Sequence, residues 1–261
     1  MNHISCIGYS SVADSSMQKG TSLNNISIVL VDTKTPANIG STARCMMNMG
    51  LPRLILVQPP EDPLREAFKL AAGANVILDK AEVFSSLKEA VADHGFVVGT
   101  SRKMGRLRKN IRAPREAAQT IIPLLPGNRV AVVFGNEVTG LERQDLSLCN
   151  ELISIPSSDA FPSLNLSHAV MIIAYELFLA STVMLPPGNE ELAPAGTIED
   201  FYQHLQKTLL DVEFLNRNKP ERMMFTLRQL FGRSRLSQRD VSILRGILSA
   251  VERAARLSEK K

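Results

Sequence analysis

The sequence predicts an α/β fold, a mainly parallel sheet flanked by helices, followed by a small all-helical domain. Two observations predict the sheet. Short apolar runs alternate with helical patterns from Ile26 onward, and runs such as VAVVFG at 130–135 are continuously apolar, as strands buried on both faces should be. A third observation is the cluster of prolines, glycines and acids in LPPGNEELAPAG, after which only helical patterns follow.

Four segments are expected along the chain. Residues 1–22 are small and polar without periodicity, which predicts a flexible N-terminal tail. The α/β domain should occupy residues 23–184, and the proline-rich linker residues 185–196. Residues 197–261 should form a helical domain with basic surfaces.

The expected strands and helices alternate along the first part of the chain. Strand-like apolar runs occupy 26–31, 53–58, 95–100, 130–135 and 151–156. Helical patterns occupy 38–49, 63–73, 83–93, 114–125 and 163–184, with a short pattern at 143–149. In the last domain, helices are expected within 197–215, 218–232 and 237–257, the first of them capped by Thr197 with Asp200.

Several classes of protein are disfavoured by composition. No apolar run approaches about 18 residues, and the N-terminus lacks a basic segment before an apolar core, so neither a membrane span nor a signal peptide is expected. We therefore expect a cytoplasmic protein. The three cysteines are widely separated and the four histidines share no ligand spacing, so no disulfide framework and no metal site are expected.

Basic residues gather in two regions, although the net charge is only +4. The stretch 101–115 contains no carboxylate, and a second region runs from Arg222 to Arg245. A single charge run is usually a solvated face, but two such regions favour a polyanion, of which nucleic acid is the commonest. The candidate RNA-binding residues are Arg102, Arg106, Arg108, Lys109, Arg112, Arg233, Arg235 and Arg245.

Aromatic residues make up 5% of the chain and Trp is absent, so recognition by shape and phosphate contacts is favoured over base stacking. Removing Arg106, Arg108 and Lys109 should weaken RNA binding and flatten its salt dependence.

The common cofactor and catalytic motifs are missing. No GxGxxG follows any expected strand, which disfavours a dinucleotide-binding turn. The stretch GNEVTGLE resembles the start of a P-loop but lacks the Lys and Ser or Thr that contact phosphate and magnesium. No GxSxG or HExxH is present, although a triad can be assembled from distant positions.

Three polar turns remain, each following an apolar strand. Taken singly, their residues are most simply turn and cap residues. Taken together, three such turns at one sheet edge can line one pocket, because open α/β sheets bind ligands outside the carboxyl ends of their strands. The first turn carries Asn38, Gly40 and Arg44, the second Gly135, Asn136, Glu137 and Gly140, and the third Pro156, Ser163 and Asn165.

The stretches NIGSTAR, FGNEVTGL and IPSSDAFPSLNLSHAV, in this order, resemble the three motifs of the SPOUT methyltransferases, specifically the TrmH-like branch that methylates ribose 2′-hydroxyls in RNA. The segment from TIEDFYQHLQKTL to ILRGILSAVE is similar to the C-terminal extension of the TrmJ subgroup. The resemblance covers about residues 25–256. It implies a deep trefoil knot over roughly 130–183, a homodimer, S-adenosylmethionine as cofactor and tRNA as substrate, methylated at nucleotide 32.

The same resemblance implies roles for individual residues. Arg44 matches the catalytic arginine, and Asn38, Glu137, Ser163 and Asn165 match motif residues around it. A guanidinium is nearly always charged, so Arg44 is better suited to orienting the hydroxyl, or to holding a substrate phosphate that takes the proton, than to acting as a base. Glu137 is expected to orient Arg44. The cofactor pocket should involve Thr100, Ser101, Phe134, Gly135, Asn136, Ile155, Pro156, Ser163 and Leu164.

Two departures from the TrmJ pattern bear on substrate choice. Asn136 stands where an arginine is expected, and the loop SSDAFPS differs from the sequence that is usual at this place in the subgroup. Neither touches Arg44, Glu137, Ser163 or Asn165, so the reaction is unchanged, whereas the exact nucleotide and the base preference are open. The alternatives are an rRNA ribose methyltransferase of the same superfamily and a non-catalytic RNA-binding protein that retains the fold.

Overall fold

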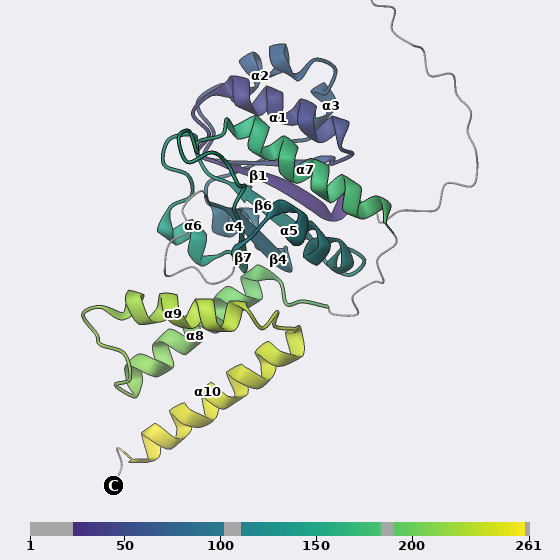
Figure 1. Cartoon of the computed structure of the whole chain (residues 1–261). Helices are drawn as coiled ribbons and strands as arrows, with labels where there is room; N and C mark the ends of the chain where they lie inside the picture. Colours follow the sequence, from purple (N-terminus) through teal and green to yellow (C-terminus); the bar gives the residue numbers. More distant parts are fainter. Residues whose placement is uncertain (1–22, 102–110, 184–190, 259–261) are drawn as a thin grey trace, which may run out of the picture.

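A computed structural model describes residues 23–101, 111–183 and 191–258. Its centre is a seven-stranded sheet in the order β3-β2-β1-β6-β4-β7-β5, in which every pair of neighbours is parallel (Figure 1). The strands are β1 (Ile26–Val31), β2 (Arg53–Val57), β3 (Glu82–Phe84), β4 (Phe96–Thr100), β5 (Ile111–Arg112), β6 (Val130–Phe134) and β7 (Glu151–Ile153). The α/β class with a parallel sheet is confirmed.

The middle of the sheet is apolar throughout. Every residue of β1 and β6 is buried, as their continuous runs of Val, Ile and Leu predict. In register, Ile28 of β1 lies beside Leu54 of β2 on one side and Val132 of β6 on the other. The ends of β1 and β6, which carry the first two polar turns, therefore stand on a fully buried part of the sheet.

Helices cover both faces of the sheet, and the side chains of β1, β2, β4 and β6 alternate between two apolar clusters. The larger cluster joins Ile28 and Leu30 to residues of five helices, and the smaller joins Val29 and Val31 to α4 (Leu87–Ala90). The five helices are α1 (Pro36–Asn48), α2 (Pro63–Ala71), α3 (Asn75–Asp79), α5 (Pro114–Ile121) and α7 (Leu166–Thr182). The short helix α6 (Arg143–Ser147) follows the second polar turn.

Helix α1 lies between α2 and α7 and packs closely against α2. A Cβ atom on Gly40 would lie 2.1 Å from the carbonyl oxygen of Ala67, so only glycine permits this approach. The glycine of the first motif therefore serves helix packing.

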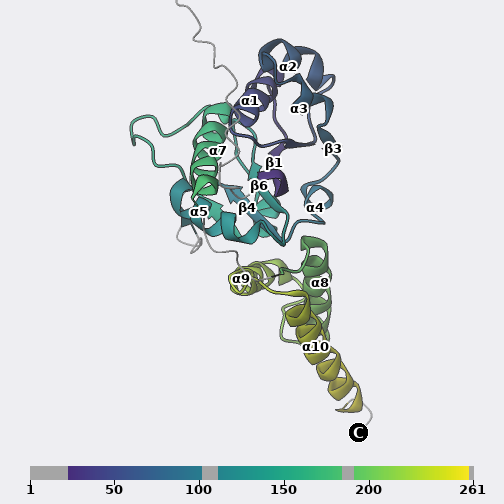
Figure 2. The ribbon, with the colours of Figure 1, turned by 90° about the vertical axis from the view of Figure 1, so that its right-hand side faces the viewer.

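The C-terminal helices α8 (Ala195–Asp211), α9 (Pro220–Gly232) and α10 (Gln238–Ser258) form a separate helical unit. Its small core contains Phe201, Leu205, Met224, Val241 and Leu248. Figure 2 shows this unit at one end of the α/β unit, with α10 projecting away from it.

Polar contacts join the two units. The backbone N–H groups of Ala195 and Gly196 donate to the carbonyls of His94 and Ala92, at 2.8 and 2.9 Å. The Arg143 guanidinium of α6 stacks over the ring of Phe225 in α9, 4.9 Å from its centroid.

Three local expectations need correction. Helix α8 begins at Ala195, so Thr197 and Asp200 lie inside the helix and do not cap it. The strand β5 and the helix α3 were not expected. The segment expected to be helical at 83–93 contains the end of β3 followed by one helical turn at 87–90.

The tail predicted for residues 1–22 and part of the predicted linker lie outside the described residues. The boundaries of the four segments and the trefoil knot stay predictions.

Candidate active site

A cavity of about 290 Å³ lies where β4, β6 and β7 end and α7 begins. This volume is near the lower end of the range for small-molecule pockets. Its walls come from the strand ends at Thr100, Ser101 and Ile153, from the turn 134–141, and from the loop and helix start at Ile155 and 162–169. The second and third polar turns thus meet at one cavity, as their positions after parallel strands predict, whereas the first turn, expected to share this pocket, does not line it.

The turn 135–141 is compact because Gly135, which has no side chain, lets the backbone of Gly140 come close. A Cβ on Gly135 would lie 2.1 Å from the carbonyl carbon of Gly140. Gly140 itself adopts a left-handed φ of +72°, and its N–H donates to the carbonyl of Asn136 at 3.0 Å. The side-chain oxygen of Asn136 accepts from the N–H groups of Val138 and Thr139 at 2.9 and 2.7 Å. The turn therefore presents a defined polar edge to the cavity.

Glu137 links the second turn to the first. Its carboxylate accepts hydrogen bonds from the backbone N–H groups of Lys34 and Thr35, at 3.0 and 3.3 Å, and from the Asn38 side chain at 2.7 Å. Burial acts to raise the pKa of Glu137, but the hydrogen bonds from Lys34 and Asn38 outweigh it and hold the pKa below its usual value. Glu137 is thus an ionised anchor for the start of α1.

Asn38 and Asn165 extend this network to the third turn. Asn165 donates from its side-chain amide to the Asn38 oxygen at 3.0 Å. Its own oxygen accepts from the N–H and hydroxyl of Ser167, at 2.9 and 2.8 Å, and so caps the N-terminus of α7. A continuous chain of hydrogen bonds therefore connects all three polar turns.

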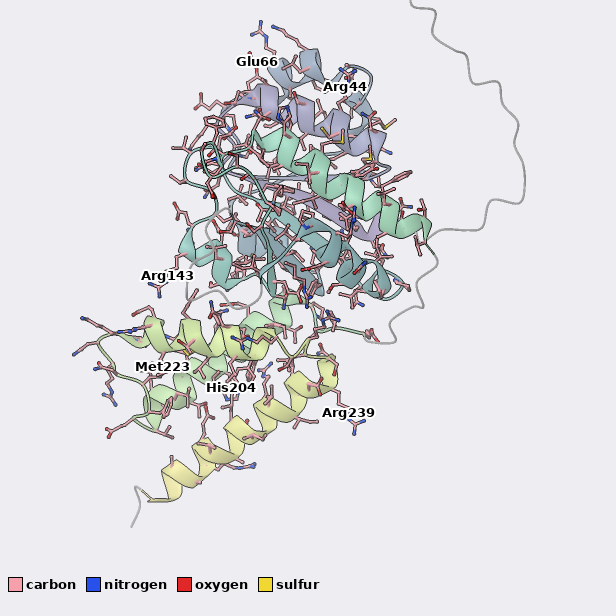
Figure 3. All side chains as sticks on the ribbon, in the orientation of Figure 1. Arg44, Glu66, Arg143, His204, Met223 and Arg239 are labelled. Atoms are coloured by element: carbon pink, nitrogen blue, oxygen red, sulfur yellow. The ribbon has the colours of Figure 1, made fainter. Side chains whose placement is uncertain are left out.

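Arg44 lies outside the cavity. It is exposed on α1, and it makes no hydrogen bond or ion pair with the residues that the structure describes. Figure 3 shows it on the side of the α/β unit farthest from α8–α10. The expected contact between Glu137 and Arg44 is absent from the described part of this single chain, because the Glu137 carboxylate faces the backbone of residues 34 and 35 instead.

Most residues expected to bind a cofactor line this cavity. They are Thr100, Ser101, Phe134, Gly135, Asn136, Ile155, Ser163 and Leu164, whereas Pro156 does not line it. The lining residues that sequence reasoning missed include Leu141, Ile153, Leu166 and Ala169. They are apolar positions at or next to element ends, and such residues are usually assigned to the core. Val138, Phe161 and Leu164 leave large apolar side chains exposed around the site, at 85%, 79% and 40%.

The residues expected to bind RNA divide into three groups. Arg233 and Arg245 are exposed on the helical unit. Arg112 and Arg235 both face Glu151: Arg112 donates to it at 3.0 and 3.4 Å, and Arg235 lies 3.9 Å from it. Arg102, Arg106, Arg108 and Lys109 lie outside the described residues. Contact with RNA stays a prediction for all of them, and the pairing with Glu151 gives Arg112 and Arg235 a structural role.

Within residues 23–101, 111–183 and 191–258, no three His, Cys, Asp or Glu side chains gather as metal ligands would. In the same ranges, no helix has the length and apolar character needed to cross a membrane.

Comparisons with known proteins give consistent results. Residues 25–175 match the model of the SpoU rRNA Methylase family, and residues 196–260 match that of the tRNA methyltransferase TrmJ C-terminal domain. The chain is 42% identical to the tRNA (cytidine/uridine/adenosine-2′-O-)-methyltransferase TrmJ of Pseudomonas aeruginosa, over 92% of this chain and 98% of the relative. It is 39% identical to the tRNA (cytidine/uridine-2′-O-)-methyltransferase TrmJ of Escherichia coli, over 88% and 96%.

Solved structures agree with this result. The crystal structure of TrmJ from Z. mobilis ZM4 has a TM-score of 0.75 and 32% identity, covering 87% of this chain and 98% of that one. A probable methylase family protein from Haemophilus influenzae has a TM-score of 0.58 and 33% identity, covering 90% and 99%. The expected resemblance is confirmed over both the α/β unit and the helical unit.

Proposed function

Because the chain belongs to the SpoU methylase family and carries a TrmJ C-terminal domain, we propose that it transfers a methyl group to a ribose 2′-hydroxyl of tRNA. The observation that carries this proposal is the cavity at the ends of β4, β6 and β7, in which two motif turns meet and to which a chain of hydrogen bonds ties the third. We further propose nucleotide 32 of the anticodon loop as the target and the cytoplasm as the site of action.

The residues around the cavity fit S-adenosylmethionine. Leu141, Ile153 and Leu166 offer apolar walls for an adenine ring, and the backbone of the turn 135–141 offers polar groups for its edge. When bound, the cofactor supplies a methyl group on a positively charged sulfur. The chain must then bring a ribose hydroxyl into line with that methyl group and reduce the cost of losing its proton.

The motif residues have different roles in this reaction. Glu137, Asn38 and Asn165 hold the three turns in one arrangement, and Ser163 lies at the cavity. Arg44 remains charged, so its guanidinium can orient the hydroxyl or hold the neighbouring phosphate through two N–H donors. Its position outside the cavity leaves this role to an arrangement in which Arg44 serves the site of a second chain.

A homodimer provides that arrangement. Helix α7 exposes a row of large apolar side chains, which is the kind of surface that subunit interfaces bury. These side chains are Ile172, Tyr175, Phe178 and Leu179, followed by Val183, and Met47 on the neighbouring α1 is also exposed. Arg44 is exposed on the same helix α1 and would face the partner.

The function is tested by incubating the purified chain with unmodified tRNA transcripts and S-adenosylmethionine and measuring 2′-O-methylated nucleosides by mass spectrometry. A product at nucleotide 32 that disappears in Arg44→Ala supports the proposal. The matched control is Arg65→Ala, an exposed arginine on α2 that should leave the yield unchanged. Product from rRNA fragments but not from tRNA would favour an rRNA methyltransferase, and binding of both ligands without product would favour a non-catalytic RNA-binding protein.

The dimer is tested by mixing inactive variants. If each site takes Arg44 from one subunit and Ser163 from the other, then Arg44→Ala mixed with Ser163→Ala should regain up to about a quarter of the activity, through mixed dimers with one intact site. A monomer in sedimentation at assay concentrations would contradict the dimer.

A further inference from the structure

Asp32 occupies an unusual position directly after β1. Its backbone adopts a left-handed φ of +52°, a conformation that Asp and Asn tolerate better than most residues. Its N–H donates to the carbonyl of Val57 at 2.8 Å, which fixes the residue at the edge of the sheet. Its carboxylate is placed between the Lys34 ammonium and the side-chain amide of Asn136, which donates at 3.0 Å. No motif of the sequence includes Asp32.

The carboxylate determines which way the Asn136 amide faces. The hydrogen bond from Lys34, joined by that from Asn136, holds the pKa of Asp32 below its usual value, so the group is ionised and can only accept hydrogen bonds. Asn136 must therefore present its NH₂ group to Asp32. Its oxygen is left to accept from the N–H groups of Val138 and Thr139, the two bonds that close the turn.

The same short segment holds the next residue of the turn. While Asp32 binds the Asn136 side chain, the backbone N–H groups of Lys34 and Thr35 bind the Glu137 carboxylate. Two adjacent residues are thus attached to residues 32–35. The turn they begin supplies residues 136–140 to the wall of the 290 Å³ cavity, whereas Asp32 itself is not part of that wall.

We propose that Asp32 is a positioning residue for the cofactor site, which acts through Asn136 to set the shape of the turn 136–140. This inference rests on the proposed function, since it assumes that the cavity binds S-adenosylmethionine. It predicts an effect on cofactor affinity without a matching effect on the chemical step, because Asp32 does not line the cavity and acts on it through Asn136.

The first test compares cofactor binding to the full chain by calorimetry. Asp32→Gly removes the carboxylate without straining the left-handed backbone and should weaken S-adenosylmethionine binding about tenfold, with kcat at saturating cofactor within about twofold. Asp32→Asn keeps an acceptor and should stay within about threefold of the wild type. Lys34→Met removes only the ion pair and should leave affinity unchanged. Equal affinities for the wild type and Asp32→Gly would overturn the inference.

The second test exchanges the pair and holds even if Asp32→Gly folds poorly. Asn136→Asp retains the acceptor for Val138 and Thr139 but sets two carboxylates against each other, so cofactor affinity should fall by tenfold or more. Adding Asp32→Asn restores a donor facing an acceptor and should recover affinity to within about threefold of the wild type. Failure of this rescue would overturn the role of the pair.

The outcomes separate this inference from the proposed function. If the wild-type chain binds no S-adenosylmethionine, both the proposed function and the role of Asp32 are contradicted. If it binds and methylates tRNA while the exchanged pair shows no rescue, only the role of Asp32 is lost.

Discussion

The α/β unit and the helical unit are stabilised in different ways. The strands that carry the site are almost entirely buried, and their polar turns bond to one another through Glu137, Asn38 and Asn165. In the helical unit, a small apolar core is supplemented by charged pairs between helices, such as Arg228 with Glu199 at 2.7 and 3.0 Å. The turns of the candidate site therefore stand on a large buried core, whereas the exposed arginines that we propose to face RNA stand on a small one.

The largest effect is expected from a change at Gly135, in the turn 135–141 of the α/β unit. In Gly135→Ala, the new Cβ would meet the backbone of Gly140 at 2.1 Å, so the turn cannot close as it does now. Cofactor affinity, measured by calorimetry, should fall at least a hundredfold. The control is Gly127→Ala, where nothing lies within 4 Å of the added carbon. An unchanged affinity in Gly135→Ala would show that the turn is not rigid.

A smaller effect should come from the charged pair of the helical unit. Glu199 is largely buried, and although burial raises its pKa, the bonds from Arg228 lower it below the usual value. Glu199→Gln should cost about 1.5–2 kcal/mol of unfolding free energy at neutral pH, measured by denaturant titration, and leave cofactor binding intact.

The same pair predicts a pH dependence. The folded pKa of Glu199 is depressed, so its contribution is fully present above the usual value of 4.5 and is lost as the pH falls through the folded pKa. Below that range, wild type and Glu199→Gln should converge in stability. A constant difference down to pH 2 would contradict the assigned ionisation.

The smallest effect should come from the exposed arginines. Arg245→Gln removes a charge from α10 and should weaken tRNA binding only a few-fold, while reducing the slope of log affinity against log salt by about 0.9. Figure 3 places Arg239 on the same helix, pointing into solvent, and its change should add a similar step. Arg65→Gln on α2 is the matched control. A loss without a change in slope would mean that these residues do not contact phosphate.

The parts of this structure that sequence reasoning recovered are those whose signal is local. The continuous apolar runs of β1 and β6 are visible in the sequence, and so are the glycines and asparagines of the turns after them. The two-residue β5 has no such signal, since Ile111 and Arg112 form a strand only by pairing with β7.

The partners of charged side chains were harder to predict. Glu137 was expected to face Arg44, but its partners include two backbone N–H groups, which no residue type reveals. The sequence predicts phosphate contacts for Arg112 and Arg235 because their sequence neighbours are basic. Their shared carboxylate, Glu151, is 39 and 84 residues away along the chain and is brought to them only by the fold.

Glu151 also links the two basic regions that we propose to contact RNA. Arg112 belongs to the basic stretch 101–115 and Arg235 to the basic region 222–245, so Glu151 holds one residue of each region at one point. Surfaces held at a fixed spacing act on a long polyanion as a bivalent ligand, and the second contact then forms at a high effective concentration. On this basis, tRNA affinity should reflect the product of two modest contacts. Breaking the link between the two basic regions should lower tRNA affinity by more than the loss of either region's contacts alone.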